Sequence, residues 1–342
     1  MTDDLDDNDK TVSLTPLWLF LVGVLFIESA LRLLPEGFMT RTLQHRAEEI
    51  RYLPATPIQL MGDSVSSAIR AAQLEQSLGA GPGHEVSNYS LPGTSPMFNY
   101  FVLRRQLNAG EAPRTIVFAP HPCTWRDPFV DRFLARFADP KEAAILLRDG
   151  VKFSDWFYGV LCRASYTLRY REEFYLALTQ GERGFFQTWH KPVTSVQNTR
   201  AKISPDELAP AAPPPAHIDP AQLPPTLTTA ITIHPYNEFY FDRLCALAAT
   251  QGIQIIWLTL PEAQVFRDQF PGPARTAAYA PFVQRMQARH ANLHPLSTEI
   301  PVLPDNHYQD PWHLNRYGAW VFSQQAGRQL ADRLASLRGP NP

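Results

Sequence analysis

The chain has 342 residues, of which 44% are hydrophobic and 19% are charged, a composition that suits one large folded domain or two small ones. Its formal net charge is -2 and it has no long basic run, which excludes the electrostatic surface typical of nucleic-acid-binding proteins. Three scattered cysteines, Cys123, Cys162 and Cys245, are too few for a disulfide framework or a zinc cluster, and no phosphate loop or dinucleotide fingerprint is present. We therefore predict no metal and no cofactor.

The N-terminus combines an acidic, polar stretch with an apolar segment. Residues 1–12 predict a disordered tail, and residues 13–34 contain the uninterrupted apolar core Leu17 to Ile27. Because a membrane span needs about 20 residues, Glu28 and Arg32 must lie near a membrane face. No small-residue cleavage site follows, which favours an uncleaved single-pass anchor over a signal peptide. An amphipathic helix packed on the domain is the alternative.

The charges that flank this segment bear on its orientation. Lys10 alone precedes it, whereas Arg41, Arg46 and Arg51 follow it in a predicted linker at 35–56. Because loops rich in lysine and arginine stay on the cytoplasmic side, this distribution would place the main domain in the cytoplasm.

Residues 57–338 predict the main domain, in which strand and helix signals alternate. The expected strands are the short apolar runs at 57–61, 85–89, 115–119 and 253–260. The expected helices are at 65–78, 96–107, 238–250, 277–290 and 316–337. Strands that alternate with helices predict an α/β fold with a parallel sheet covered on both faces.

A long insertion, about residues 121–230, interrupts this alternation. It contains helical stretches and then eight prolines between Pro205 and Pro225. Prolines at this density exclude a helix or a central strand, so that segment predicts an extended surface loop. The aromatic clusters of the insertion are more typical of a packed core than of a glycan or lipid platform; they comprise Trp156, Phe157, Tyr158, Tyr170, Phe174 and Tyr175.

Gly62-Asp63-Ser64 follows the first expected strand and precedes a helix. Open α/β sheets place ligands and nucleophiles at such junctions, where a tight turn through a glycine exposes the hydroxyl. Backbone N–H groups at the start of the helix then face a developing oxyanion. The alternative is an ordinary helix capped by Asp63 or Ser64.

Asp310-Pro311-Trp312-His313 precedes the last expected helix. A serine hydroxyl needs a base to remove its proton, and histidine is the usual one. A carboxylate such as Asp310 fixes the tautomer of the imidazole and stabilises its charged form. These residues predict Ser64 as nucleophile, His313 as base and Asp310 as its partner; a chance Asp and His at a helix start is the alternative.

Together these two motifs resemble the SGNH (GDSL) hydrolase superfamily, which has Gly-Asp-Ser after its first strand and Asp-x-x-His before its last helix. The motifs fall at positions 62–64 and 310–313, so the resemblance covers most of the chain. It implies a flavodoxin-like three-layer sandwich, here with a long insertion and an N-terminal transmembrane helix. It also implies that the backbone N–H of Gly93 binds the oxyanion, although Gly93 could simply be a turn glycine after Pro92.

One departure from the family pattern concerns the third block, which usually supplies an asparagine. The corresponding stretch is Ala119-Pro120-His121-Pro122. Either the oxyanion hole has two donors, or His121 substitutes for the third; His121 as a structural loop residue is the alternative. Loss of one donor typically lowers the rate about 10²–10³-fold.

The layout is similar to that of bacterial cell-envelope members, such as the SGNH protein of teichoic-acid D-alanylation and partners of membrane-bound O-acyltransferases. This resemblance implies serine-dependent acyl transfer or ester hydrolysis on an envelope glycan, through a Ser64 acyl-enzyme. It implies an acylated glycan or an acyl donor as substrate, a membrane-bound O-acyltransferase as partner, and a periplasmic or extracellular main domain, in conflict with the arginine distribution. Two alternatives stay open: a non-catalytic SGNH scaffold and a cytoplasm-facing, membrane-bound lipid esterase.

Overall fold

A computed structural model describes residues 15–33, 55–79, 85–171, 175, 178–179, 212, 218, 230–270 and 276–338. Three predicted segments lie outside the described residues, wholly or for the most part: the tail at 1–12, the linker at 35–56 and the proline-rich stretch at 205–225.

The central sheet has five parallel strands in the order β2-β1-β3-β4-β6. The strands are β1 (Ile58–Gly62), β2 (Val86–Asn88), β3 (Thr115–Ala119), β4 (Gln254–Trp257) and β6 (Leu293–Pro295). Every residue of β1 and β3 is buried, as expected for strands covered on both faces. The prediction of an α/β fold with a parallel sheet is therefore confirmed.

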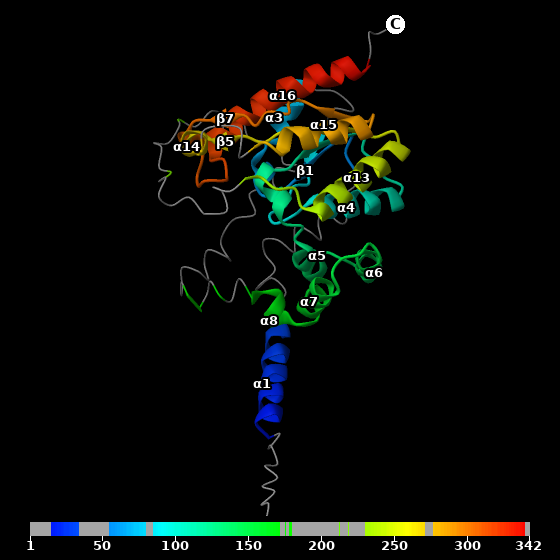
Figure 1. The fold of residues 1–342 in the computed structure, drawn as a ribbon, viewed down its shortest axis with the longest axis vertical. Coiled ribbons are helices and arrows are strands. Elements are labelled where there is room, and N and C mark those ends of the chain that lie inside the picture. Colours follow the sequence, from blue (N-terminus) through cyan, green and yellow to red (C-terminus); the bar gives the residue numbers. More distant parts are fainter. Residues whose placement is uncertain are drawn as a thin grey trace, which may run out of the picture.

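Helices cover both faces of this sheet (Figure 1). Buried side chains of α3 (Ala71–Leu78) and α16 (Arg316–Arg338) share one hydrophobic core with Val117 and Ile256. Buried side chains of α4 (Pro96–Asn108), α13 (Pro235–Thr250) and α15 (Tyr279–Arg289) share the other with Phe118 and Trp257. Neighbouring strand residues point to opposite faces, so apolar residues at successive positions supply both cores.

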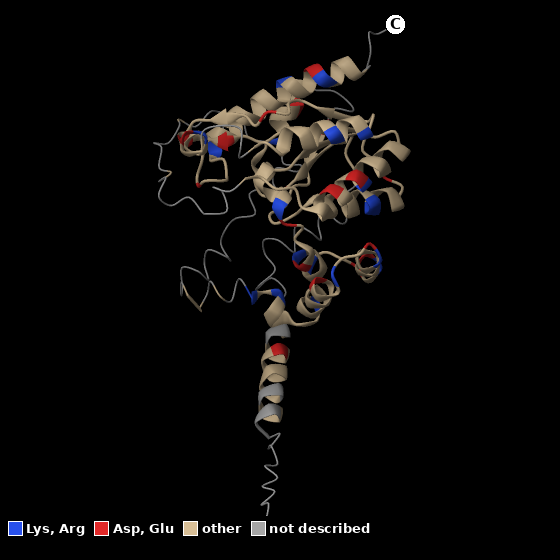
Figure 2. Cartoon of the chain, viewed as in Figure 1, with Lys and Arg blue, Asp and Glu red and all other residues tan. Residues whose placement is uncertain are grey.

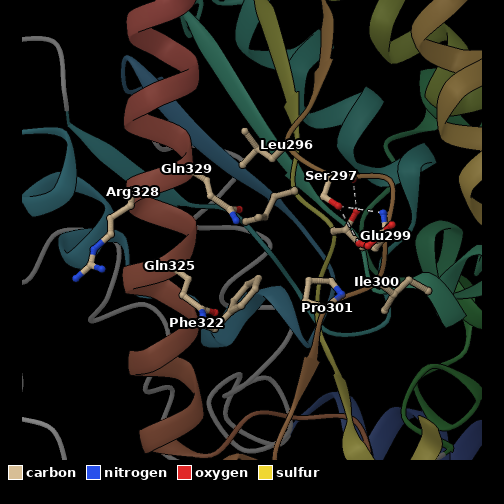
Figure 3. A pocket seen from close by; sticks show the side chains of 11 residues that line it. Leu296, Ser297, Glu299, Ile300, Pro301, Phe322, Gln325, Arg328 and Gln329 are labelled. Atoms are coloured by element: carbon tan, nitrogen blue, oxygen red, sulfur yellow. Dashed lines mark hydrogen bonds between the residues drawn. The ribbon is translucent and has the colours of Figure 1, made fainter.

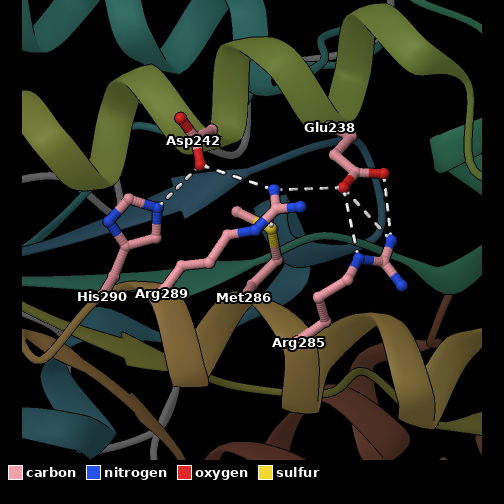
Figure 4. Close-up of polar contacts among 6 residues, drawn as sticks. All are labelled: Glu238, Asp242, Arg285, Met286, Arg289 and His290. Carbon is pink, nitrogen blue, oxygen red and sulfur yellow. Dashed lines mark hydrogen bonds and ion pairs between the residues drawn. The ribbon is translucent and has the colours of Figure 1, made fainter.

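Ion pairs join α13 to α15 on the surface (Figure 4). Glu238 lies 3.0 Å from Arg285 and 3.4 Å from Arg289, and the Asp242 carboxylate lies 2.9 Å from His290 Nε2. The arginine side chains are about half exposed, so each pair contributes only about 0–1 kcal/mol.

The helix predicted at 65–78 is interrupted. A 3₁₀ turn, η1 (Ser66–Ala68), precedes an extended Ile69 with ψ 130°, and α3 begins only at Ala71. The Asn88 amide donates to the carbonyls of Ser66 and Ile69, at 3.0 and 2.9 Å. A helix would use those carbonyls itself, so a side chain from β2 competes with the helical hydrogen bonds.

Outside the insertion, four short α-helices and strands among the described residues were not predicted. They are β6, α14 (Gln264–Gln269), and the two strands of a small parallel sheet, β5 (Glu262–Ala263) and β7 (Val302–Leu303). Segments of two to six residues are too short for an apolar period to identify.

The first part of the predicted insertion folds as helices that join the main core. It contains η2 (Pro122–Arg126), α5 (Val130–Arg136), α6 (Pro140–Arg148), α7 (Phe153–Ala164) and α8 (Tyr166–Arg169). Trp125 stacks on Trp257 with ring centroids 5.4 Å apart, and Phe133 stacks on Phe101 at 5.0 Å. These contacts make the beginning of the insertion continuous with the α/β domain.

The insertion aromatics only partly form a core, and the prediction was wrong for several of them. Trp156 is half-buried and donates from Nε1 to the Ala143 carbonyl at 2.8 Å, and Tyr170 is buried. Phe157, Tyr158 and Tyr175 are exposed. Phe174 lies outside the described residues.

Helix α1 (Thr15–Arg32) projects away from the rest of the structure (Figure 1). Several of its large apolar side chains are exposed, among them Trp18, Leu19, Leu25 and Phe26. Within the part of the chain that the structure describes, no helix has both the length and the apolar character needed to cross a membrane. The anchor at 13–34 stays a prediction.

Candidate active site

Ser64 lies in the turn that follows β1, at the carboxyl edge of the sheet. Gly62, the last residue of β1, pairs with Ala119 of β3. A Cβ at Gly62 would clash with the Ser66 hydroxyl and the Ala119 carbonyl, so only glycine lets β1 turn this closely beside β3. The close packing at this point positions the half-buried Ser64 at the surface of the sheet edge.

Asp63 connects the turn after β1 with the loop after β3. Its carboxylate accepts hydrogen bonds from the backbone N–H of Val65 at 2.8 Å and of His121 at 2.7 Å. The side chain is almost fully buried, and this burial raises the pKa of Asp63 although its hydrogen bonds oppose the change. Asp63 therefore fixes the loop on which Ser64 stands, and it is not part of the triad.

His313 and Asp310 lie in a short loop closed by an antiparallel bridge between Tyr308 and Leu314. His313 Nε2 is 3.0 Å from Ser64 Oγ, and His313 Nδ1 is 2.9 Å from Asp310 Oδ2. The structure thus brings Ser64, His313 and Asp310 into one hydrogen-bonded chain. Both lengths fall in the range of a working nucleophile–base pair.

The electrostatics of Asp310 suit a partner for the imidazole. Burial alone would raise the pKa of Asp310, but hydrogen bonds and charge from His313, with the backbone N–H groups of His313 and Trp312, outweigh it and lower that pKa. An ionised Asp310 accepts a hydrogen bond from the N–H of His313 Nδ1. In neutral imidazole, Nε2 then accepts the hydroxyl proton of Ser64.

Gly93 lies in the loop after β2, which is held against the end of β1. The Thr94 hydroxyl lies 2.8 Å from the Gly62 carbonyl, two residues before Ser64. Gly93 has a φ of +66°, in the left-handed region that favours glycine. Its position next to a residue bonded to the end of β1 fits the predicted donor role, which remains a prediction.

Arg132 is a neighbour of Gly93 that the sequence did not indicate. A Cβ on Gly93 would meet Arg132 Nη1 at 2.7 Å, so the guanidinium packs directly against the glycine. Arg132 comes from the first turn of α5 and also lies over the Phe129 ring, 5.3 Å from its centroid. In sequence it is one of several arginines in an amphipathic stretch, and only the fold brings it to this loop.

The contacts of His121 favour its structural alternative. It is buried; its backbone N–H donates to Asp63, and its Nδ1 accepts from the backbone N–H of Cys123 at 3.3 Å. Its ring lies 5.5 Å from that of Trp312, edge to face. His121 therefore caps η2 and packs beside the loop that carries His313.

The structure also shows the surroundings of His234 and of the three cysteines. His234 caps α13, with Nδ1 accepting from the Tyr236 backbone N–H at 3.2 Å. Each of the three cysteines is buried, and none belongs to a disulfide among the described residues. Among the described residues, no three His, Cys, Asp or Glu side chains group closely enough to hold a metal ion.

A separate cavity of about 460 Å³ lies between the sheet and α16 (Figure 3). Polar side chains of Ser297, Glu299, Gln325 and Gln329 line it beside Phe322. Ser64, His313 and Asp310 do not line this cavity, so it is separate from the site that they form.

The chain matches no protein-family model, and a comparison with curated proteins found no match.

Proposed function

We propose that this protein is an SGNH-type serine hydrolase or O-acyltransferase that acts on an acylated glycan of the cell envelope. The observation that carries the proposal is the chain from Asp310 through His313 to Ser64, with contacts of 2.9 and 3.0 Å. Its position at the carboxyl edge of a parallel sheet supports it, since open α/β sheets place their sites there. The strand order has the flavodoxin-like arrangement that the family resemblance implies.

The geometry supports a two-step reaction. As Ser64 Oγ attacks the ester carbonyl carbon, its proton moves to His313 Nε2, and the tetrahedral intermediate forms. The C–O bond to the leaving alcohol then breaks, Nε2 returns the proton to that alcohol, and an ester on Ser64 remains. In the second step an incoming hydroxyl loses its proton to Nε2 and attacks this ester. Collapse of the second tetrahedral intermediate returns the proton to Ser64. If the acceptor is water, the protein is an esterase; if it is a sugar hydroxyl, the protein is a transferase.

The oxyanion of this intermediate requires donors near Ser64. We assign this role to the backbone N–H of Gly93 and, in place of the absent third-block asparagine, to the guanidinium of Arg132, which packs against Gly93. A guanidinium in this position would stabilise the developing negative charge more strongly than a neutral amide.

The envelope location is part of the same proposal. Exposed apolar side chains on α1 support a single-pass anchor formed by residues 13–34, with the main domain in the periplasm or outside the cell. An envelope glycan and a membrane-bound O-acyltransferase are then the substrate and partner that fit this location.

A serine-directed fluorophosphonate probe tests the catalytic proposal on the purified full chain. Labelling should disappear in Ser64→Ala and fall at least about 10²-fold in His313→Ala, because an unassisted hydroxyl is a poor nucleophile. Ser154→Ala, at an exposed serine on α7, is the matched control and should label like the wild type. Equal, slow labelling of wild type and His313→Ala would contradict the enzyme hypothesis and favour the non-catalytic scaffold.

Reporter fusions test the location. A reporter that is active only in the periplasm, fused after Pro342, should be active. A silent fusion, with an active cytoplasmic reporter at the same position, would reverse the orientation and favour the cytoplasm-facing lipid esterase.

A further inference from the structure

A basic recess lies where α7 meets α8, away from the triad. It has a volume of about 560 Å³, and its lining residues are Val160, Arg163, Ala164, Tyr166 and Arg169. Figure 2 shows basic residues beside α8, at the end of α1 that is nearest the rest of the structure. The recess thus combines two guanidinium groups and a phenol with small apolar side chains.

Helix α1 is attached directly beside this recess. The Glu28 carboxylate accepts hydrogen bonds from the Ser165 hydroxyl at 2.5 Å and from the backbone N–H of Tyr166 at 2.7 Å and Thr167 at 3.1 Å. Glu28 is therefore a carboxylate whose charge is balanced by three donors, and it ties the end of α1 to the start of α8.

An apolar stripe on α7 leads into the recess. Phe153, Phe157 and Leu161 follow one another at intervals of four residues, and all three are exposed. Val160 and Ala164, which line the recess, are three residues farther along the helix from Phe157 and Leu161 and share their side of α7. The arrangement places exposed aromatic and apolar side chains next to the two arginines, near the end of α1 (Figure 1).

We infer that this recess binds the phosphate of an anionic phospholipid headgroup, with Arg163 and Arg169 on the phosphate and the α7 stripe in the membrane interface. Arginine suits this ligand because its fork of donors matches phosphate oxygens. Aromatic side chains favour the level of the headgroups, and basic side chains near the surface attract anionic lipids. The inference rests on the membrane attachment proposed for residues 13–34.

Lipid retention tests this inference on the full chain. The protein is reconstituted into nanodiscs of phosphatidylcholine with a minority of phosphatidylglycerol, released in mild detergent, and its bound lipids are counted by native mass spectrometry. The wild type should retain phosphatidylglycerol above its share in the nanodisc. Arg163→Gln and Arg169→Gln should each lower this enrichment roughly fivefold, since a basic side chain at the membrane surface is worth about that factor.

Matched variants separate this effect from overall charge and from folding. Arg285→Gln/Arg289→Gln removes two positive charges, more than either single variant, from the remote α15 surface and should keep the enrichment. The Arg169 side chain also donates to the Arg163 carbonyl, so Arg169→Gln could act by disturbing the local structure. Arg163→Lys/Arg169→Lys keeps both charges and should therefore keep part of the phosphatidylglycerol enrichment. Wild-type lipids in the bulk ratio, or an unchanged enrichment in the glutamine variants, would overturn the inference.

Two further arms identify the source of the phosphate and the role of the anchor. Inorganic phosphate titrated into the protein in pure phosphatidylcholine nanodiscs should show no saturable binding. Phosphate binding that depends on Arg163 and Arg169, without lipid enrichment, would show that the recess binds free phosphate and not a lipid headgroup. Flotation with phosphatidylcholine vesicles reports on attachment alone. Loss of flotation would disprove the anchor, whereas flotation without enrichment would disprove only the headgroup site.

Discussion

His313 Nε2 lies 3.0 Å from Ser64 Oγ, although 249 positions separate the two residues in the chain. The contact joins the turn after the first strand to the loop before the last helix. No short-range interaction along the chain brings these two residues together, so their contact depends on the tertiary fold. It is also the contact on which the proposed chemistry depends.

Asp310→Asn should slow fluorophosphonate labelling about 10²–10⁴-fold, because an amide donor beside Nδ1 favours the wrong imidazole tautomer. The loop should remain folded, since the asparagine oxygen can still accept from the backbone N–H groups of Trp312 and His313. Labelling rates with near-ultraviolet circular dichroism would check both points. Wild-type rates in this variant would show that His313 acts without its carboxylate.

The lowered pKa of Asp310 also predicts a pH dependence of stability. A carboxyl whose pKa is lower in the folded than in the unfolded state stabilises the fold above its unfolded pKa, here near the ordinary 3.8. That stability is lost as the pH falls through the lower, folded value. The difference in unfolding free energy between wild type and Asp310→Asn should therefore shrink below pH 3.8, as measured by urea unfolding. A difference that grows at low pH would contradict this sign.

Arg132 should matter for turnover more than for stability. Arg132→Gln should lower kcat/KM for a model ester about 10²-fold, comparable to the loss of one oxyanion donor, with the larger part in kcat. Arg132→Lys keeps the charge but not the fork of donors, so its kcat/KM should lie between those of the wild type and Arg132→Gln. The control is Arg136→Gln, at the far end of the same helix. Equal effects of the two glutamine variants would indicate a structural role for α5.

Asp63→Ala should destabilise the fold. It removes the acceptor of two short hydrogen bonds, from Val65 and His121, in a nearly fully buried position. Each buried N–H left without a partner costs about 1–3 kcal/mol, so we expect the two to lower the free energy of unfolding by about 2–6 kcal/mol. Chemical denaturation measures this directly. Stability within 0.5 kcal/mol of the wild type, about the spread of ordinary surface substitutions, would show that water replaces the carboxylate.

Glu28→Gln should loosen the attachment of α1 to α8. The carboxylate caps the first turn of α8, and loss of such a cap costs about 0.5–2 kcal/mol. Hydrogen exchange at the amides of Tyr166 and Thr167 should speed up several-fold, while that in β3 should not change. Faster exchange throughout the protein would indicate a global rather than a local effect.

Much of the local structure could be predicted from the sequence. Buried strands such as 115–119 are continuous apolar runs. The ends of the helices that alternate with them can be predicted from glycine, proline and the spacing of apolar residues. The break at Ile69 could not be predicted, because it arises from hydrogen bonds that Asn88 makes from another strand. Strands of two or three residues, such as β6, carry too little pattern to stand out from loops.

The candidate site divides in the same way. By itself the sequence determined which residue types were present for the chemistry: a serine after a strand, and a histidine with an aspartate three residues before it. Only the tertiary structure decided that they meet, that the backbone N–H and Nδ1 of His121 bond Asp63 and Cys123, and that Arg132 packs against Gly93. The physical reason is range. Strand and helix signals depend on neighbours within a few positions, whereas a side-chain hydrogen bond or packing contact depends on two distant segments being fixed by the same buried core.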